Sequence, residues 1–217
     1  MNNKAMKYIS ENMKKMLDGV GAEMSKYLLQ GMNFYEKEYK KYKETVPREA
    51  VAHNFNLYID KEIESAKKEE HNIEIAKKIR CKAKCNHCCK IHVGITDDEA
   101  YLMLRYAKEK ELKINIPKLQ RQADKTVNSW NDQSKGDQIC VFLGMDGLCK
   151  VYEHRPIACR KYLVLEDPKH CNPITNKGRK VQVFNAYRAE TIASALMNAT
   201  EYGSLPKMLL KEIKESQ

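Results

Sequence analysis

Four cysteine thiols and one histidine lie within nine residues, in the stretch Cys81-Lys-Ala-Lys-Cys85-Asn-His-Cys88-Cys89. Two cysteines separated by two or three residues can turn both sulfurs toward one metal from a single tight loop, so such spacings recur in zinc and iron–sulfur sites. Adjacent side chains point apart, and Cys88 and Cys89 would bind one mononuclear ion together only from a distorted turn. The stretch therefore predicts either two centres that share it, or one centre with a structural role for one of the adjacent pair.

The rest of the chain supplies four more cysteines, at positions 140, 149, 159 and 171. Eight thiols would also suit a framework of four disulfides, or buried core positions. Disulfides need an oxidising compartment, and Met1–Lys7 has no apolar segment of the kind a secretory signal requires. No apolar run approaches the length that spans a bilayer. These features favour metal binding in the cytoplasm, with no membrane partner.

The chain carries a net charge of +10 and has a pI near 9.1. A basic balance permits binding to nucleic acid, to an anionic surface or to an acidic partner. Lysine and glutamate alternate along the expected helices, however, which is typical of solvated helix faces. Near the cysteines, Lys82, Lys84 and Lys90 are expected to offset the negative charge of a thiolate site. Arg155 and Arg160 are further candidates for that role, or for hydrogen bonds to the cysteine loops.

Apolar residues at spacings of three and four predict a helix over residues 3–45, with a break near Gly19 and Gly21. A second helix is predicted over residues 48–79, and the two are expected to pack as a hairpin. Residues 1–80 would then form an N-terminal helical arm, which is a candidate surface for a protein partner.

Short elements are predicted around and after the cysteine cluster. Thr96 and Glu99 form a capping box, which opens a helix that ends near residue 111. The other expected elements are a strand over 91–95, a helix over 117–130, a β-hairpin over 139–152, a short helix over 153–162, and helices over 180–201 and 205–215. The fold class is therefore mainly α, with a cysteine-cluster domain over 81–175 and C-terminal helices over 176–217 that pack on the same core.

Several separated motifs agree with one family. They are Cys85-x2-Cys88-Cys89, Thr96-x2-Glu99-Ala100, Cys140-x-Phe142-Leu143, Gly147-x-Cys149-x-Val151-Tyr152 and Arg155-Pro156-x2-Cys159-Arg160-x-Tyr162. Together they resemble the YkgJ-like CxxCxxCC family of zinc- or iron-chelating domains. The resemblance implies a helical scaffold around a metal-binding region. It also implies metal ligation by all eight cysteines, which are Cys81, Cys85, Cys88, Cys89, Cys140, Cys149, Cys159 and Cys171.

The chain departs from the family pattern at both ends of the match. Three residues separate Cys81 from Cys85, where the family has two, and Cys171 lies further beyond Cys159 than expected.

Flagellin lysine N-methylases look similar around the cluster and are associated with an iron–sulfur centre. The resemblance therefore implies an iron–sulfur cluster, for example of the 4Fe–4S type, with zinc as the other thiolate-bound metal.

Three functions follow as hypotheses. The first is a metal-binding cysteine-cluster protein, and the second is an S-adenosylmethionine-dependent protein lysine methyltransferase. The chain has no glycine-rich nucleotide loop, although Cys81-x3-Cys85-x2-Cys88 also has the spacing of a radical S-adenosylmethionine motif. The third is a nucleic-acid-binding module pinned by zinc. Possible auxiliary ligands are His87, His92, His154 and His170.

Overall fold

The computed structural model describes residues 11–82, 84–176 and 179–216. Helices dominate this part of the chain, which confirms the expected mainly helical fold with one short antiparallel pair of strands. The α-helices are α1 (Glu11–Gly19), α2 (Ala22–Thr45), α3 (Arg48–Lys68), α4 (Ile73–Ala76), α5 (Asp97–Glu109), α6 (Ile116–Ala123), α7 (Ile157–Arg160), α8 (Tyr187–Ala199) and α9 (Leu205–Glu215). The 3-10 turns are η1 (Glu70–Asn72), η2 (His87–Lys90), η3 (Trp130–Asp132), η4 (Tyr152–His154) and η5 (Pro168–Cys171).

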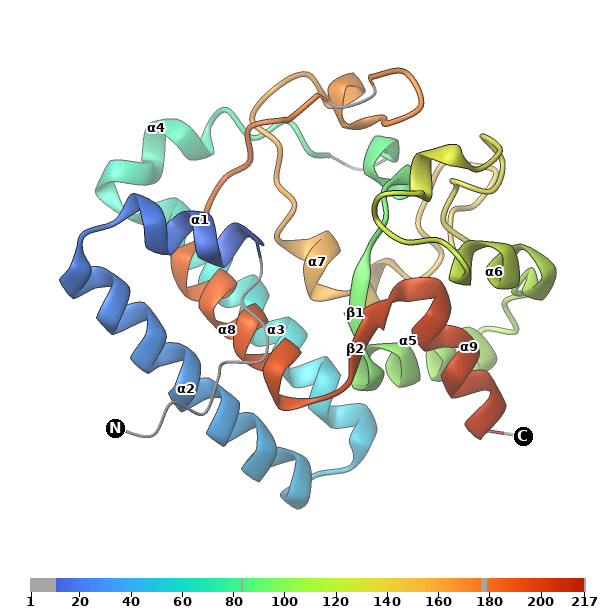
Figure 1. The fold of residues 1–217 in the computed structure, drawn as a ribbon, viewed down its shortest axis with the longest axis horizontal. Helices are drawn as coiled ribbons and strands as arrows, with labels where there is room; N and C mark the ends of the chain where they lie inside the picture. The colour runs from blue at the N-terminus through green and yellow to red at the C-terminus, as the bar shows by residue number, and fades with distance from the viewer. Residues whose placement is uncertain (1–10, 83, 177–178, 217) are drawn as a thin grey trace.

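Two groups of helices flank a central pair of strands, β1 (Gly94–Thr96) and β2 (Tyr202–Ser204) (Figure 1). Helices α1, α2, α3 and α8 lie on one side, and α5, α6 and α9 lie on the other. Helix α5 joins the groups, because it contacts α3 as well as α9. None of the helices in the described ranges combines the length and apolar character that crossing a membrane requires.

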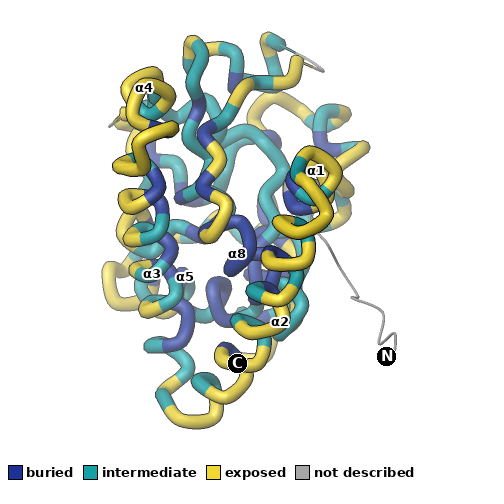
Figure 2. Tube along the Cα trace, turned by 90° about the vertical axis from the view of Figure 1, so that its left-hand side faces the viewer, coloured by how far each residue is buried: buried dark blue, intermediate teal, exposed yellow. Residues whose placement is uncertain are grey.

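Helix α8 forms the centre of the first group, and Figure 2 shows it in dark blue in the interior. Small side chains such as Ala189 and Ala193 are fully buried on it and allow neighbouring helices to approach closely. A Cβ on Gly31 of α2 would lie only 3.4 Å from Thr191 Cγ2 of α8. The glycine that weakens the helix propensity of α2 therefore lies at its contact with α8.

The expected pairing of the first two long helices is present in part. Tyr39 of α2 packs edge-on against Phe55 of α3, with ring centroids 4.8 Å apart. Helix α8 packs along both helices, however, so the three form one layer. The break expected near Gly19 and Gly21 is confirmed between α1 and α2, and residues 3–10 of the expected helix lie outside the described residues. The division of the chain at residues 80 and 175 stays a prediction.

Two expected helices end earlier than predicted. Helix α3 ends at Lys68 and not near residue 79, because Glu69 has an extended backbone and the Asn72 side chain donates to the Ala66 carbonyl at 3.0 Å. Helix α6 ends at Ala123 and does not reach Trp130. The indole of Trp130 instead donates to the Lys90 carbonyl at 2.8 Å. The loop that carries Trp130 therefore lies against the end of the cysteine segment.

The strands lie elsewhere than expected. Strand β1 pairs antiparallel with β2, with Ile95 opposite Gly203, more than 100 residues along the chain. The predicted hairpin over residues 139–152 is wrong as a pair of strands, since this segment forms turns with a single bridge between Leu143 and Cys149. The expected strand over 91–95 is shifted, and β1 runs directly into α5.

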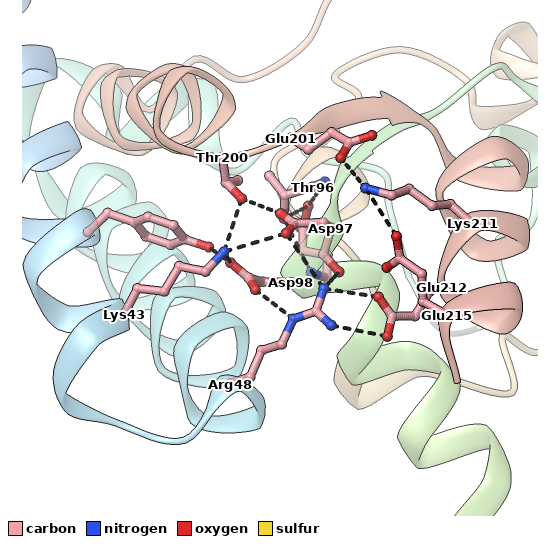
Figure 3. A network of polar contacts seen from close by, with 12 residues as sticks. Lys43, Arg48, Thr96, Asp97, Asp98, Thr200, Glu201, Lys211, Glu212 and Glu215 are labelled. Carbon is pink, nitrogen blue, oxygen red and sulfur yellow. Dashed lines mark hydrogen bonds and ion pairs between the residues drawn. The ribbon is translucent and has the colours of Figure 1, made fainter. Parts of the chain in front are cut away.

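A buried carboxylate links the two groups of helices (Figure 3). The Asp98 side chain is fully buried at the start of α5 and accepts from the Tyr39 hydroxyl at 2.5 Å. It also pairs with Lys43 of α2 at 2.7 Å and with the Arg48 Nε of α3 at 3.0 Å. Arg48 reaches on to Glu212 of α9 at 2.9 Å. One network therefore joins α2, α3, α5 and α9.

Candidate metal centre

The cysteine cluster occupies a turn and a short 3-10 helix. Cys85 N donates to the Lys82 carbonyl at 3.0 Å, and Lys84 has a positive φ of 66°, a left-handed conformation that lysine rarely adopts. Cys88 and Cys89 follow on η2, whose end is closed by the bond from Ile91 N to the Cys88 carbonyl. Lys82, Lys84 and Cys85 thus take part in a turn that follows Cys81.

Backbone hydrogen bonds tie this segment to the loop that carries the next two cysteines. Cys140 N donates to the Cys89 carbonyl at 2.7 Å, and the Asn86 side chain donates to the Gly147 carbonyl at 3.3 Å. Cys149 lies opposite Leu143 in the single bridge of that loop. Two hydrogen bonds therefore hold the loop of Cys140 and Cys149 against the cysteine segment.

Cys159 lies on α7, and a buried glutamate holds the start of that helix. One Glu99 oxygen accepts from Ile157 N at 2.7 Å, while the other accepts from Thr96 N at 2.8 Å. The expected capping box is confirmed, and the same side chain caps a second helix. Arg160, which is 5% exposed, donates to the Arg155 carbonyl and pairs with Asp60 of α3. Arg160 thus anchors α7 to α3.

The outermost cysteines in the sequence approach the same region. The Cys81 sulfur accepts from Val164 N at 3.3 Å and lies 3.7 Å from the Tyr162 carbonyl. Cys171 is buried on η5, which packs against η2. Cys81 and Cys171, which depart most from the family pattern, therefore lie near the rest of the cysteine segment.

Charge on one thiolate raises the pKa of another, and this effect weakens with distance. Burial raises the pKa of Cys171 to about 12, and charge on Cys88, Cys81 and Cys85 adds to the effect. Burial also raises the pKa of Cys159, with contributions from Cys140, Cys88 and Cys149.

The thiols therefore form two neighbourhoods. One contains Cys81, Cys85 and Cys171, and the other contains Cys140, Cys149 and Cys159.

The adjacent pair lies between these neighbourhoods. A hydrogen bond between the two thiols lowers the pKa of Cys88 to about 7 and raises that of Cys89. Charge on Cys140 and Cys159 also raises the pKa of Cys89, which places it with the second neighbourhood. Charge on Cys88 raises the pKa values of thiols in both neighbourhoods.

Two cations oppose this accumulation of negative charge. Burial raises the pKa values of Cys81 and Cys149, while Arg155 lowers both. The guanidinium stacks 3.9 Å from the Tyr152 ring centroid, and its Nε is buried without a hydrogen-bond partner in the described part of the chain. The charge of Lys118 likewise lowers the pKa of Cys140, against the larger effect of burial. Of the lysines expected to do this, Lys82 and Lys84 are exposed.

The four candidate histidines divide into two kinds. His170 contacts Glu166 at 3.3 Å. The other three each bury one ring nitrogen that has no partner among the described residues, and they are His87, His92 and His154. His154 packs against Tyr106, with ring centroids 4.4 Å apart, and His92 packs against Trp130.

All eight cysteines are free thiols. Within residues 11–82, 84–176 and 179–216, no three cysteine, histidine, aspartate or glutamate side chains stand in a geometry that would hold a metal ion. The donor set nevertheless fits a soft metal, because thiolates select zinc, copper(I) and iron–sulfur centres.

One of three comparisons with known proteins gives a match. A family model named CxxCxxCC, described as "Putative zinc- or iron-chelating domain", matches residues 80–192. That range is slightly more than half of the chain and contains all eight cysteines. No curated protein and no solved structure matches the chain.

Proposed function

The chain belongs to the CxxCxxCC family of zinc- or iron-chelating domains, and from that premise we propose that it binds two metal ions through two sets of four thiolates. The first thiol set is Cys81, Cys85, Cys88 and Cys171. The second thiol set is Cys89, Cys140, Cys149 and Cys159. The two sets use every cysteine of the chain.

The division follows from the adjacent pair. Cys88 and Cys89 lie side by side on η2 with their thiols hydrogen-bonded, so two centres that share this pair would lie next to each other. The Cys89 carbonyl accepts a hydrogen bond from Cys140 N, so we place Cys89 in the second set. Both cysteines lie on η2, which packs against the η5 turn of Cys171, and of the two it is Cys88 whose charge raises the pKa of Cys171. Each set then contains the four thiolates that a closed structural zinc site requires.

Zinc is the metal we propose for both sets. Ligands on neighbouring residues bring the two centres close together, and a single ion with zinc–sulfur bonds of about 2.3 Å needs less room than an iron–sulfur cubane. When bound, the ions would supply cross-links between the cysteine loops, as structural zinc does in small domains. A reducing compartment such as the cytoplasm would keep the thiols available. The methyltransferase and nucleic-acid hypotheses stay predictions.

Metal analysis of the purified protein tests this proposal. The chain is purified without oxygen, and its metals are quantified per chain while its visible spectrum is recorded. We expect two zinc ions per chain and a colourless protein. Stoichiometric iron and sulfide with visible absorption would show that the chain holds an iron–sulfur cluster and not zinc. A chain without bound metal would contradict the proposal.

Replacing Glu99 by alanine is expected to weaken the second set selectively. The change removes the acceptor of Ile157 N, which holds the helix of Cys159, and leaves a buried donor unsatisfied at a cost of about 1–3 kcal/mol. After dialysis against a weak chelator, the variant should retain one metal per chain while the unaltered protein retains two.

Glu99→Gln is the matched control, since its amide oxygen can still accept from Ile157 N. This variant should retain close to two metals per chain. Circular dichroism at the same temperature establishes that both variants are folded. Full retention of metal by Glu99→Ala would show that Glu99 does not position Cys159.

A further inference from the structure

A cavity of about 330 Å³ lies beside the cysteine segment, and its wall includes one cysteine from each proposed thiol set. These are Cys88 of the first set and Cys159 of the second. A divalent ion with its shell of water molecules occupies on the order of 200 Å³, since each water takes about 30 Å³ in the liquid. The cavity therefore has room for a hydrated metal ion beside a member of each set.

The cavity also has an imidazole on its wall. His92 packs edge-on against Trp130, with ring centroids 5.3 Å apart, and its Nε2 is buried without a hydrogen-bond partner among the described residues. Burial lowers the pKa of His92, so the ring is uncharged near neutral pH. Neutral imidazole is the form that binds metals, and zinc accepts it beside thiolates. His92 therefore adds a nitrogen donor to the two cysteines of the wall.

These three residues suit a site of transit more than a resident site. In the described part of the chain they do not form a group that would hold a metal ion, and each thiol set already supplies four ligands. Zinc takes a fifth ligand for a short time, so an imidazole can bind the ion before a thiolate does, or after a thiolate releases it. Lys161 of the same wall is paired with Glu190, which offsets a charge that would otherwise repel a cation.

We propose that zinc enters and leaves both thiol sets through this cavity, with His92 as the transfer ligand that binds the ion on its way. This route rests on the proposed function, because it concerns the exchange of the metals in those two sets. It goes beyond that function by assigning a role to His92, which neither set includes. The open volume and the nitrogen donor can each be removed separately.

Exchange of zinc isotopes measures the route in the full, zinc-loaded chain. Protein loaded with one stable isotope is mixed with an excess of another, desalted at intervals and analysed by mass spectrometry. Val183→Phe adds a ring to the wall of the cavity and should slow exchange at least threefold while both zinc ions stay bound. Loosening of the fold would instead speed exchange, so slower exchange reports a narrower route.

Val127→Phe is the matched control, because Val127 is 66% exposed and does not line the cavity. Exchange in Val183→Phe that is as fast as in this control would overturn the proposed route. Circular dichroism establishes that the variants are folded. If phenylalanine prevents folding, Val183→Leu is the smaller addition and should slow exchange in the same direction.

Removal of the transfer ligand is the second test. His92→Phe keeps a ring against Trp130 but has no nitrogen donor, and it should also slow exchange at least threefold with both zinc ions bound. His71→Phe is its control, since the His71 side chain is 70% exposed and does not line the cavity. Unchanged exchange in His92→Phe would refute the role of His92. Loss of one zinc ion from this variant would make His92 a resident ligand and would likewise contradict the proposal.

Alkylation of the metal-free, reduced chain separates the route from the metal sites. Iodoacetamide should modify Cys88 and Cys159 at least threefold more slowly in Val183→Phe than in Val127→Phe, as measured by mass spectrometry of peptides. Two bound zinc ions with unchanged exchange and alkylation would refute the route and leave the metal sites intact. A chain that binds no zinc, but in which Val183→Phe still protects both thiols, would refute the metal sites and zinc exchange with them, although the cavity leads to both thiols.

Discussion

The double variant Cys149→Ser with Cys171→Ser is expected to bind no metal, whereas Cys149→Ser with Cys159→Ser retains one metal per chain. The first pair of substitutions takes one thiol from each proposed set, and the second pair takes both from the second set. Each double variant lacks two cysteines, so a single cluster held by all eight thiols would treat them alike. Metal quantification after size exclusion, with the unaltered chain beside it, measures the difference.

The loss of both metals should also lower the free energy of unfolding by a large amount. Structural zinc contributes about 10–16 kcal/mol in small zinc-binding peptides. Among the described residues from 73 to 94, no side chain is fully buried, so this segment draws little stability from apolar packing. We expect amide hydrogens of the cysteine loops to exchange freely in the variant without metal, while α8 and α9 stay protected. Equal metal content in the two double variants would refute the division into two sets.

Asp98→Asn should be the most destabilising single substitution outside the cysteine region. The amide keeps the shape of the side chain but removes the charge that pairs with Lys43 and Arg48. Breaking a buried ion pair costs about 3–5 kcal/mol, and we expect about 3 kcal/mol because Arg48 keeps Glu212. For a chain of this size that lowers the Tm by about 6–12 °C.

Asp132→Asn provides the matched control, since Asp132 is exposed on η3. Its effect should stay within about 0.5 kcal/mol, as for most surface substitutions. Urea titrations followed by circular dichroism give both values. If the two variants unfold at the same urea concentration, the network in Figure 3 does not stabilise the junction of the helix groups.

Local sequence signals predicted several elements correctly. The Thr96 and Glu99 capping box opens α5 as expected, and α9 spans the predicted residues 205–215. Caps and apolar periodicity act within one or two turns of a helix, so they can be recognised from neighbouring residues alone. The cysteine spacings belong to the same class of signal, and they led to the family that the comparison confirmed.

Other predictions failed where distant residues compete for the same groups. The apolar run over 139–143 resembled a strand, but Cys140 N donates to the Cys89 carbonyl and not to a hairpin partner. Strand β2 lay between two expected helices, and its partner β1 precedes it by more than 100 residues. The additional role of Glu99 at Ile157 N could not be inferred either, since a capping box already accounts for that residue.

Sequence by itself determined the donor groups of this protein, namely eight thiols, four of them within nine residues, on a mainly helical chain. Side-chain type and local spacing are properties of short segments. Only the tertiary structure decided which thiols are neighbours, where the buried Asp98 finds its cations, and that Lys161 and Glu190 meet in a cavity beside Cys88 and Cys159. These features depend on contacts between residues far apart in the chain. Such contacts form only when whole helices pack, and no local pattern encodes them.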